Sequence, residues 1–263
     1  MNSTLTDNQL KSLLDKKTEE YNNFEFITTD PIQIPHRFTK KEDIEIAGFL
    51  TATIAWGQRK SIIKNASRLM AMMDNSPYEF VTNASEKELE LLSGFVHRTF
   101  NDMDCNFFIH SLRNIYLHHA GLENVFTVGF SQNKTIINAL THFRATFLST
   151  PHLQRSEKHL SDVTSNSSAK RLNMFLRWMV RQDDCGVDFG IWKSIPSSAL
   201  LLPLDVHTGN VGRELGLLTR TQNDLKAVLE ITENLRLFDA NDPVKYDFAL
   251  FGIGAFEGKS RDF

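Results

Sequence analysis

A lysine and an aspartate, each at a predicted helix start, are the residues of this sequence best suited to chemistry. Lys170 follows a run of serines in SNSSAKRLNMFLRWMVR (165–181), where apolar residues at spacings of three and four predict a helix facing a core. The serine cluster is expected to supply the N-cap of that helix. A cation in the first turn is disfavoured by the helix dipole, so this position favours the free amine that a lysine nucleophile needs.

Asp205 ends the apolar run LLLPLD within residues 200–218 and precedes another predicted helix, for which it is expected to be the N-cap or its neighbour. A carboxylate that emerges from an apolar connector suits a general base, or a group that stabilises a cationic transition state. Each residue alone has an ordinary explanation, because exposed lysines are the norm and aspartate is a common helix cap.

The elements that position these two residues are predicted to be helices, and the fold class is all-α. Helical spacing is found over residues 5–22, 40–55, 58–73, 85–93, 103–119, 133–148, 168–182, 208–217, 222–238 and 243–252. Residues 30–38, with two prolines, predict an extended strap. The polar residues 149–168 predict a linker or hairpin entry, and residues 198–206 predict a buried connector.

Composition narrows the class of protein. The chain has 263 residues, of which 41% are hydrophobic and 23% charged, so it is long enough for a substantial core. Two cysteines exclude a disulfide scaffold and a four-thiolate cluster. The N-terminus has no signal-like apolar region, and no stretch is long and apolar enough for a membrane helix. We expect a soluble cytoplasmic protein with no membrane partner.

The net charge of −3 argues against a protein that coats nucleic acid by charge alone. A local patch could still hold a few phosphates. Residues 95–104 (FVHRTFNDMD) place Arg98 near two aspartates, either as part of a base-binding pocket or as a capped helix start with an Arg–Asp pair. The adjacent histidines His118 and His119 point about 100° apart on a helix and do not share an ion. We expect no metal and no cofactor.

Four segments resemble, in the same order, the helix-hairpin-helix-Gly/Pro-Asp DNA glycosylases such as endonuclease III. Residues 203–217 are similar to the segment that holds the catalytic aspartate, and 169–172 to the end of the hairpin that holds the lysine. Residues 52–69 resemble the early helix pair whose connecting glutamine inserts near the flipped base, and 246–256 resemble the last core helix. The likeness covers about 46–256. It looks closest to an uncharacterised bacterial family at the edge of this superfamily, with distant likeness to archaeal 8-oxoguanine glycosylases.

The resemblance implies two helical lobes with a central cleft. Residues 46–204 would form a helical-barrel lobe with a degenerate hairpin, and 1–45 with 205–263 the second lobe. Lys170 and Asp205 would face each other across the cleft of a monomer bound to double-stranded DNA with a damaged base. The implied activity is a DNA glycosylase with AP lyase activity, acting on a damaged base, such as an oxidised purine, through a lysine Schiff base.

In that reading Lys170 is the nucleophile, and Asp205 deprotonates it and stabilises the cationic sugar. The residues expected to bind DNA or line the base pocket are Trp56, Gln58, Arg59, Lys60, Arg98, Ser167, Ser168 and His207.

The sequence also departs from the superfamily pattern. Asn166 and Ser168 stand where the hairpin usually has glycines, and residues 183–199 form an apparent insertion between the lysine and the aspartate. The superfamily's arginines near Asn210 and at Glu214 are absent, as is the four-cysteine cluster motif. Two alternatives therefore stay open: a non-catalytic damaged-DNA or nucleotide-binding protein that keeps the fold, and a helical scaffold without a nucleic-acid partner.

Overall fold

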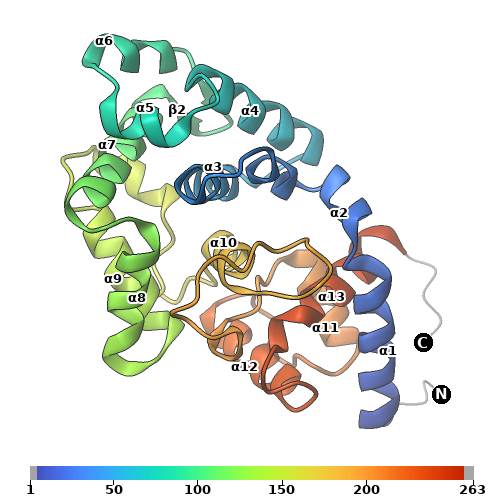
Figure 1. The fold of residues 1–263 in the computed structure, drawn as a ribbon. Coiled ribbons are helices and arrows are strands. Elements are labelled where there is room, and N and C mark those ends of the chain that lie inside the picture. The colour runs from blue at the N-terminus through green and yellow to red at the C-terminus, as the bar shows by residue number, and fades with distance from the viewer. Residues whose placement is uncertain (1–4, 258–263) are drawn as a thin grey trace. The chain divides into compact units, whose positions relative to one another are not determined.

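The computed structural model describes residues 5–257 and confirms the all-α class (Figure 1). Its helices are α1 (Asp7–Tyr21), α2 (Phe24–Thr29), α3 (Lys41–Thr53), α4 (Arg59–Met72), α5 (Pro77–Asn83), α6 (Glu86–Leu89), α7 (Asp102–His118), α8 (Leu122–Asn133), α9 (Ile136–Phe147), α10 (Lys170–Val180), α11 (Val206–Glu214), α12 (Leu225–Arg236) and α13 (Tyr246–Phe256). The strands β1 (Val96–His97) and β2 (Phe100–Asn101) form one short antiparallel pair. Within the described part of the chain, no helix is long and apolar enough to cross a membrane.

The chain divides into two compact units. Unit 1 comprises Met1–Phe26, Ser165–Gly190 and Pro196–Phe263, and unit 2 comprises Ile27–Thr164 and Ile191–Ile195. These bounds differ from the expected lobes, because α10 and the segment after it belong with the C-terminal helices. The reason is electrostatic: the buried Arg177 of α10 pairs with Asp247, and Arg181, directly after α10, pairs with Asp242.

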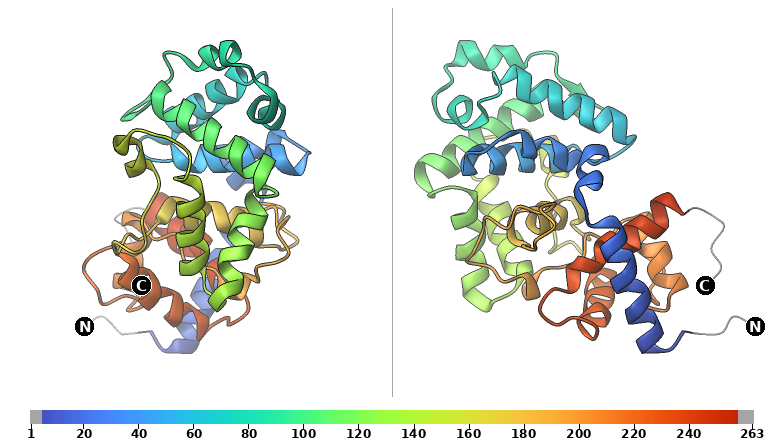
Figure 2. Two further views of the ribbon diagram at one scale, coloured as in Figure 1. Left: turned by 90° about the vertical axis from the view of Figure 1, so that its left-hand side faces the viewer. Right: turned by 45° about the vertical axis from the view of Figure 1, so that its right-hand side comes forward.

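In unit 1, α13 is the central helix, apolar almost all round, and α1 and α11 pack against it (Figures 1 and 2). Two glycines of α13 permit this close packing. A Cβ at Gly252 would lie 2.0 Å from the ring of Tyr21, and one at Gly254 would lie 2.9 Å from the Cβ of His207. The aspartate-bearing helix α11 is therefore held directly on the central helix.

In unit 2, α3 is buried along nearly its whole length, as its apolar sequence predicts. Phenylalanines surround it: the ring of Phe49 lies 5.9 Å from that of Phe108 and 5.4 Å from those of Phe143 and Phe147. Aromatic pairs at these separations add to the stabilisation that burial of apolar area provides. The phenylalanines named here fill the core of unit 2.

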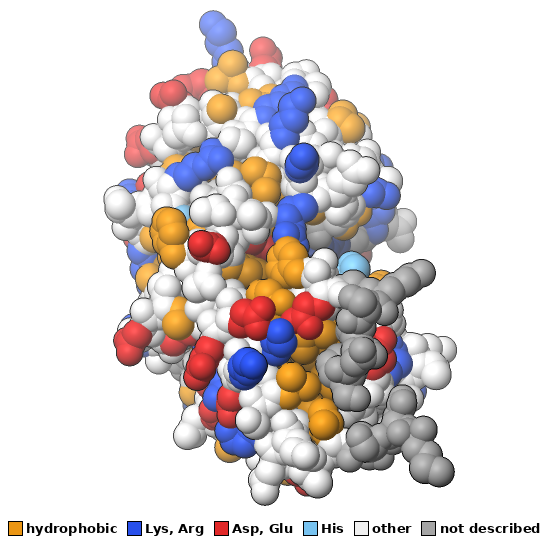
Figure 3. Space-filling model, turned by 90° about the vertical axis from the view of Figure 1, so that its right-hand side faces the viewer, with side chains coloured by type: hydrophobic (Ala, Val, Ile, Leu, Met, Phe, Trp, Pro, Cys, Tyr) orange, Lys and Arg blue, Asp and Glu red, His pale blue; other side chains and the backbone are white. Residues whose placement is uncertain are grey.

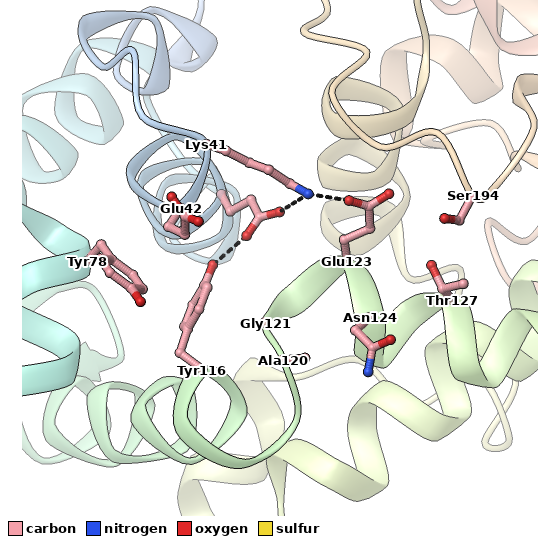
Figure 4. A pocket seen from close by; sticks show the side chains of 11 residues that line it. Lys41, Glu42, Tyr78, Tyr116, Ala120, Gly121, Glu123, Asn124, Thr127 and Ser194 are labelled. Carbon is pink, nitrogen blue, oxygen red and sulfur yellow. Dashed lines mark hydrogen bonds and ion pairs between the residues drawn. The ribbon is translucent and has the colours of Figure 1, made fainter.

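A buried carboxylate joins three parts of unit 2. Glu45 of α3 accepts hydrogen bonds from the Tyr116 hydroxyl at 2.7 Å and from the Trp192 indole N–H at 2.6 Å. Lys41 lies between Glu45 and Glu123, and Figure 4 shows Lys41 and Tyr116 converging at the pocket they line. Burial raises the pKa of Glu45 although its hydrogen bonds and Lys41 oppose that effect. The bond from Trp192 ties residues 191–195 to unit 2.

Two segments have conformations other than those expected. Residues 30–38 form two 3₁₀ turns, Pro31–Gln33 and Pro35–Arg37, in place of an extended strap. Each proline occupies the first position of its turn, where its fixed φ is favourable and its missing N–H costs nothing. The tightly bonded turns bury Ile32 and Ile34.

Residues 149–164 are packed into unit 2, so the expected linker is wrong there. A 3₁₀ helix spans Gln154–His159, and its Ser156 and His159 are buried against Asp104. Polar side chains of this segment, Ser156 and His159, are partners of the buried Asp104 carboxylate. A buried charge needs such partners, because it must be paired and hydrogen-bonded.

The Trp192–Glu45 hydrogen bond predicts a measurable difference between two buried tryptophans. Trp192→Phe should lower the free energy of unfolding by about 1–3 kcal/mol more than Trp178→Phe, because it removes one of the two hydrogen-bond donors, Trp192 and Tyr116, that the buried Glu45 carboxylate has. Trp178 is a matched control: it is 0% exposed, Trp192 is 1% exposed, and the Trp178 indole N–H has no hydrogen-bond partner in the described structure. Urea unfolding of both variants tests this, and equal losses would contradict it.

Candidate functional site

Lys170 and Asp205 lie together at the starts of two helices. Lys170 is the first residue of α10 and Asp205 caps α11, and the Lys170 Nζ atom lies 3.4 Å from the Asp205 Oδ2 atom. The side chains are 30% and 19% exposed, so solvent and a ligand can reach them. The expectation that the two residues meet is confirmed. Their expected placement on different lobes is wrong, because both belong to unit 1.

Hydrogen bonds to both its side chain and its backbone carbonyl fix the position of Asp205. Its Oδ1 atom accepts a hydrogen bond from the Thr208 N–H at 2.9 Å, which confirms the predicted N-cap. Its carbonyl accepts one from the Asn223 side chain at 3.0 Å, and Arg213 donates to that asparagine at 2.6 Å. Gly209 makes room, since a Cβ there would lie 2.8 Å from Asn223 Oδ1. The carboxylate is therefore held with its Oδ2 atom directed at Lys170.

Sequence reasoning missed Asn223 and Arg213. The signal for Arg213 was its place beside Glu214, where the superfamily pattern has an arginine. Asn223 had no signal, because its partner is a backbone carbonyl distant in sequence.

The turn before Lys170 contains two residues with a positive φ, and neither is a glycine. Asn166 has φ +64° and Ala169 has φ +46°, both in the left-handed region. The Asn166 carbonyl accepts from the Leu225 N–H at 3.1 Å, and its side chain donates to Asp224 at 2.8 Å. The turn is thus anchored to the start of α12.

The expected serine N-cap of α10 is wrong. The residue at that position is Ala169, and no side chain caps the helix. Ser167 instead accepts a hydrogen bond from the Ala169 N–H at 3.2 Å, and the Ser168 carbonyl accepts one from Asn173 at 3.0 Å. Both serines are half-buried. A helix start without a side-chain cap, beside Lys170, is suited to an anion such as phosphate.

Behind the pair lies a buried ion network that the sequence analysis did not identify. Arg177 of α10 donates to Asp188 at 3.2 Å and to Asp247 of α13. Burial is the main cause that raises the pKa of Asp247, to about 6; the negative charge of Asp205 acts in the same direction, while Arg177 and Lys170 oppose the shift. The signal was an aspartate in the otherwise apolar segment YDFALFGIGAF.

Unit 2 brings together several of the residues expected to contact DNA. Trp56, Gly57 and Gln58 form the turn between α3 and α4, and the Trp56 carbonyl lies 3.1 Å from His97 Nε2. Gly57 has φ +102°, and a Cβ there would lie 2.6 Å from the Arg98 guanidinium. Gln58 is exposed on this turn, and Arg98, from the β1–β2 hairpin, is exposed beside Gly57.

Arg59 and Lys60 begin α4, directly after Gln58. They belong to unit 2. Figure 3 shows one face of the molecule, with Lys and Arg side chains exposed among acidic and uncharged ones. His207, also expected to contact DNA, is exposed in unit 1 and packs its Cβ against Gly254.

The alternative interpretation of residues 95–104 is half correct. Asn101 caps α7 in a capping box with Asp104, so this is a capped helix start. The basic partners of Asp104 are Arg155 at 2.9 Å and His159 at 3.2 Å, and not Arg98. Arg98 instead occupies the turn of the β1–β2 hairpin with φ +56° and covers Gly57.

Within residues 5–257, no group of three or more His, Cys, Asp or Glu side chains could hold a metal ion. The candidate site consists of Lys170, the carboxylates of Asp205 and Asp247, and the start of α10.

The raised pKa of Asp247 predicts a pH dependence of stability with a definite sign. The folded state binds this proton more tightly than the unfolded chain, so the contribution of Asp247 is complete below about pH 4. It is lost as pH rises through about 6, a change of about 3 kcal/mol. The asparagine in Asp247→Asn is neutral at every pH, so the stability of this variant lacks the pH dependence that Asp247 contributes. The loss in free energy of unfolding that the substitution causes should therefore become smaller between pH 4 and pH 7.

Urea unfolding across that pH range measures this cost. Asp239→Asn is a control of opposite sign: burial raises the pKa of Asp239, but its hydrogen bonds with Lys245 and with the N–H groups of Asn241 and Asp242, together with the charge of Lys245, outweigh burial and lower the pKa. The cost of that substitution should grow as pH rises. A cost of Asp247→Asn that stays constant or grows would contradict the prediction.

Comparisons with known proteins give a family for the chain. A comparison with curated proteins and one with solved structures found no match. The model of one family, described as protein of unknown function (DUF2400), matches residues 30–256, which is most of the chain. The chain therefore belongs to the DUF2400 family of proteins of unknown function.

Proposed function

We propose that this protein is a DNA repair glycosylase with AP lyase activity, of the helix-hairpin-helix kind. The observation that carries the proposal is the 3.4 Å approach of Lys170 to Asp205 at two helix starts. An amine nucleophile needs an adjacent base to take its proton and a rigid position from which to attack. Asp205 supplies the base, and its hydrogen bonds with Thr208 and Asn223 supply the rigidity.

The proposed reaction begins when Asp205 takes a proton from the Lys170 ammonium. The free amine attacks C1′ of the damaged nucleotide, and the bond from C1′ to the base breaks with its electron pair leaving on the base, which takes up the proton that Asp205 received. Asp205 is then ionised again, and its negative charge stabilises the cationic sugar as the base departs. The C1′–O4′ bond of the sugar ring breaks next, O4′ takes up the proton that the Lys170 nitrogen loses, and a Schiff base forms between Lys170 and C1′.

The start of α10 supports DNA as the substrate. The turn with left-handed Asn166 and Ala169 leads into a helix with no side-chain cap, so N–H groups beside Lys170 can bind a backbone phosphate. Residues of unit 2 would supply the second set of groups. Gln58, with Trp56 beside it in the turn between α3 and α4, would fill the gap left by the flipped base, and Arg98 of the β1–β2 turn would contact a base edge. Arg59 and Lys60 would hold phosphates.

The distant likeness to archaeal 8-oxoguanine glycosylases makes oxidised purines the first substrates to test. Oxidised pyrimidines and abasic sites follow. A lesion-binding protein without catalysis is the alternative, and covalent trapping separates it from an enzyme, because only a Schiff base is captured by borohydride.

We expect borohydride to trap the protein on DNA that carries its lesion, and on abasic DNA. Lys170→Gln should abolish trapping and leave binding nearly intact, because it removes the amine but little surface. Asp205→Asn should slow turnover by a factor of about 100–1,000, as expected for loss of transition-state charge stabilisation. Gel electrophoresis of the trapped complex and single-turnover kinetics measure both effects.

Lys226→Gln is a matched control for Lys170→Gln. Lys226 also lies in the first turn of a helix of unit 1 and is exposed, so its loss should leave trapping unchanged. Trapping that survives in Lys170→Gln would place the nucleophile elsewhere. Absence of trapping with every lesion, together with binding to lesion-containing DNA, would favour the non-catalytic alternative.

The DNA-binding role of unit 2 gives a second prediction. Because the protein is acidic overall, only a few phosphate contacts are expected, and binding should weaken with salt with a correspondingly small slope. Arg59→Gln with Lys60→Gln should weaken binding to all duplexes and reduce that slope. Gln58→Ala should weaken binding to lesion-containing DNA more than to undamaged DNA.

Fluorescence anisotropy at several salt concentrations measures these effects. Lys87→Gln, on the short helix α6 of the same unit, controls for the loss of a positive charge. Equal losses in the control and the double variant would contradict the assignment of Arg59 and Lys60.

A further inference from the structure

The segment 223–225 contacts both the peptide of Asp205 and the turn before Lys170. Its first residue, Asn223, donates from its side-chain amide to the Asp205 carbonyl at 3.0 Å. Its second residue accepts at its carboxylate from the Asn166 side chain at 2.8 Å, and its third donates from its N–H to the Asn166 carbonyl at 3.1 Å. We call it the bridging segment, because its consecutive residues hold two parts of the site that are distant in sequence.

The hydrogen bond to Asp205 comes from an amide whose orientation is fixed. Arg213 donates to the Asn223 Oδ1 atom at 2.6 Å, so the amide nitrogen is the group left to face Asp205. The Arg213 guanidinium also donates to the carbonyls of Arg220 and Thr221, at 2.8 and 2.9 Å. A rotation of the Asn223 amide would therefore break its bond with Arg213 as well as its bond with Asp205.

On its other side, the bridging segment holds the turn that precedes Lys170. It binds the left-handed Asn166, at φ +64°, twice: once at the side chain and once at the carbonyl. Asp224 is itself held in place, because Arg220 pairs with its carboxylate and the Ala227 N–H donates to it at 3.1 Å. Lys170 begins α10 shortly after this turn, so a shift of the turn would move the amine.

We propose that the bridging segment sets the distance between Lys170 and Asp205. The two residues are far apart in sequence and lie at the starts of different helices, yet their charged groups are 3.4 Å from each other. Asn223 is therefore a positioning residue for Asp205, and Asn166 is one for Lys170. The catalytic meaning of this inference rests on the proposed function, but the coupling of the two parts can be measured without DNA.

The first experiment measures amide hydrogen exchange of the full chain by NMR, without DNA. The reporter is the Thr208 N–H, which donates to Asp205, and the substitution is Asn166→Gly, on the other side of the bridging segment. Glycine adopts the left-handed conformation freely, so this variant loses the side-chain bond to Asp224 and keeps the turn. Exchange of the Thr208 N–H should become faster by a factor of about 2–10, the effect of one hydrogen bond, because the segment that holds Asp205 is then less firmly anchored.

Asn75→Gly is the matched control for Asn166→Gly. Asn75 is also an exposed asparagine in the left-handed region, with φ +50°, but it belongs to unit 2. Its replacement should leave exchange of the Thr208 N–H unchanged. Equal exchange rates in Asn166→Gly and Asn75→Gly would overturn the inference.

The reciprocal measurement combines Asn223→Ala with the Ala169 N–H, which donates within the turn before α10. Its exchange should become faster by a similar factor. Asn234→Ala is the matched control, since the Asn234 amide also donates to a backbone carbonyl, that of Leu217, at 2.9 Å. Asn223→Asp keeps an acceptor for Arg213 and loses only the donor, so it gives the same test if Asn223→Ala fails to fold. An unchanged Ala169 N–H in these variants would overturn the inference.

The second experiment measures the rate of borohydride trapping on abasic DNA. Asn223→Ala should slow trapping by a factor of about 10–100 and leave the dissociation constant for DNA unchanged, because a misplaced base costs rate and not binding. In the Asp205→Asn background the same substitution should have almost no further effect, since a positioning residue acts through the group that it positions. A loss of stability alone would not depend on the background in this way. Asn234→Ala should leave the trapping rate unchanged in both backgrounds.

The outcomes separate this inference from the proposed function. Unchanged exchange at the two reporters, or a slowing of trapping by Asn223→Ala that is equal in both backgrounds, would overturn the inference and leave the proposed function standing. Faster exchange at both reporters without trapping on any DNA would overturn the proposed function and leave the bridging segment as the link between the two helix starts.

Discussion

Two arginines, Arg177 of α10 and Arg181 directly after it, are buried with aspartates from two stretches of unit 1, residues 183–188 and 242–247. Arg177 pairs with Asp188 and Asp247, and Arg181 pairs with Asp188, Asp183 and Asp242. A guanidinium group in a low-dielectric interior is strongly destabilising unless carboxylates pair with it. Any fold that moved α10 away from these aspartates would therefore leave buried charges without partners. The position of α10 follows from this network, and with it the position of Lys170. The placement of Lys170 beside Asp205 therefore depends on the buried ion pairs of Arg177 and Arg181.

The same network explains which parts of the fold could be predicted from sequence. The amphipathic stripe of α10, the apolar length of α3 and the cap at Asp205 are local properties, and each is confirmed. The division into units is not local. Arg177 and Asp247 are 70 residues apart. The spacing of apolar residues does not predict which partner a charged residue in an apolar helix will have.

The misassigned loops have a related physical cause. Residues 149–164 are polar, as a linker would be, but their polar side chains are partners for the buried carboxylate of Asp104. A polar segment is therefore expected to be exposed to solvent only when its side chains are not needed as partners for a buried charge. The hairpin at 96–101 escaped prediction because its turn uses Arg98 in a left-handed conformation that sequence rules assign to glycine or asparagine.

The turn before Lys170 holds two residues, Asn166 and Ala169, in the left-handed region although neither is a glycine. A left-handed residue needs either no Cβ or a side chain that tolerates the conformation, and asparagine is the common substitute. Asn166 adopts φ +64° and uses its amide to bind Asp224, while its carbonyl binds the next helix start. Ala169 has no such side chain, so the strain at φ +46° must be offset by its nearly complete burial and its hydrogen bond to Ser167. Strain held immediately before Lys170 ties the placement of that amine to the turn, and is a reason to regard the turn as part of the site.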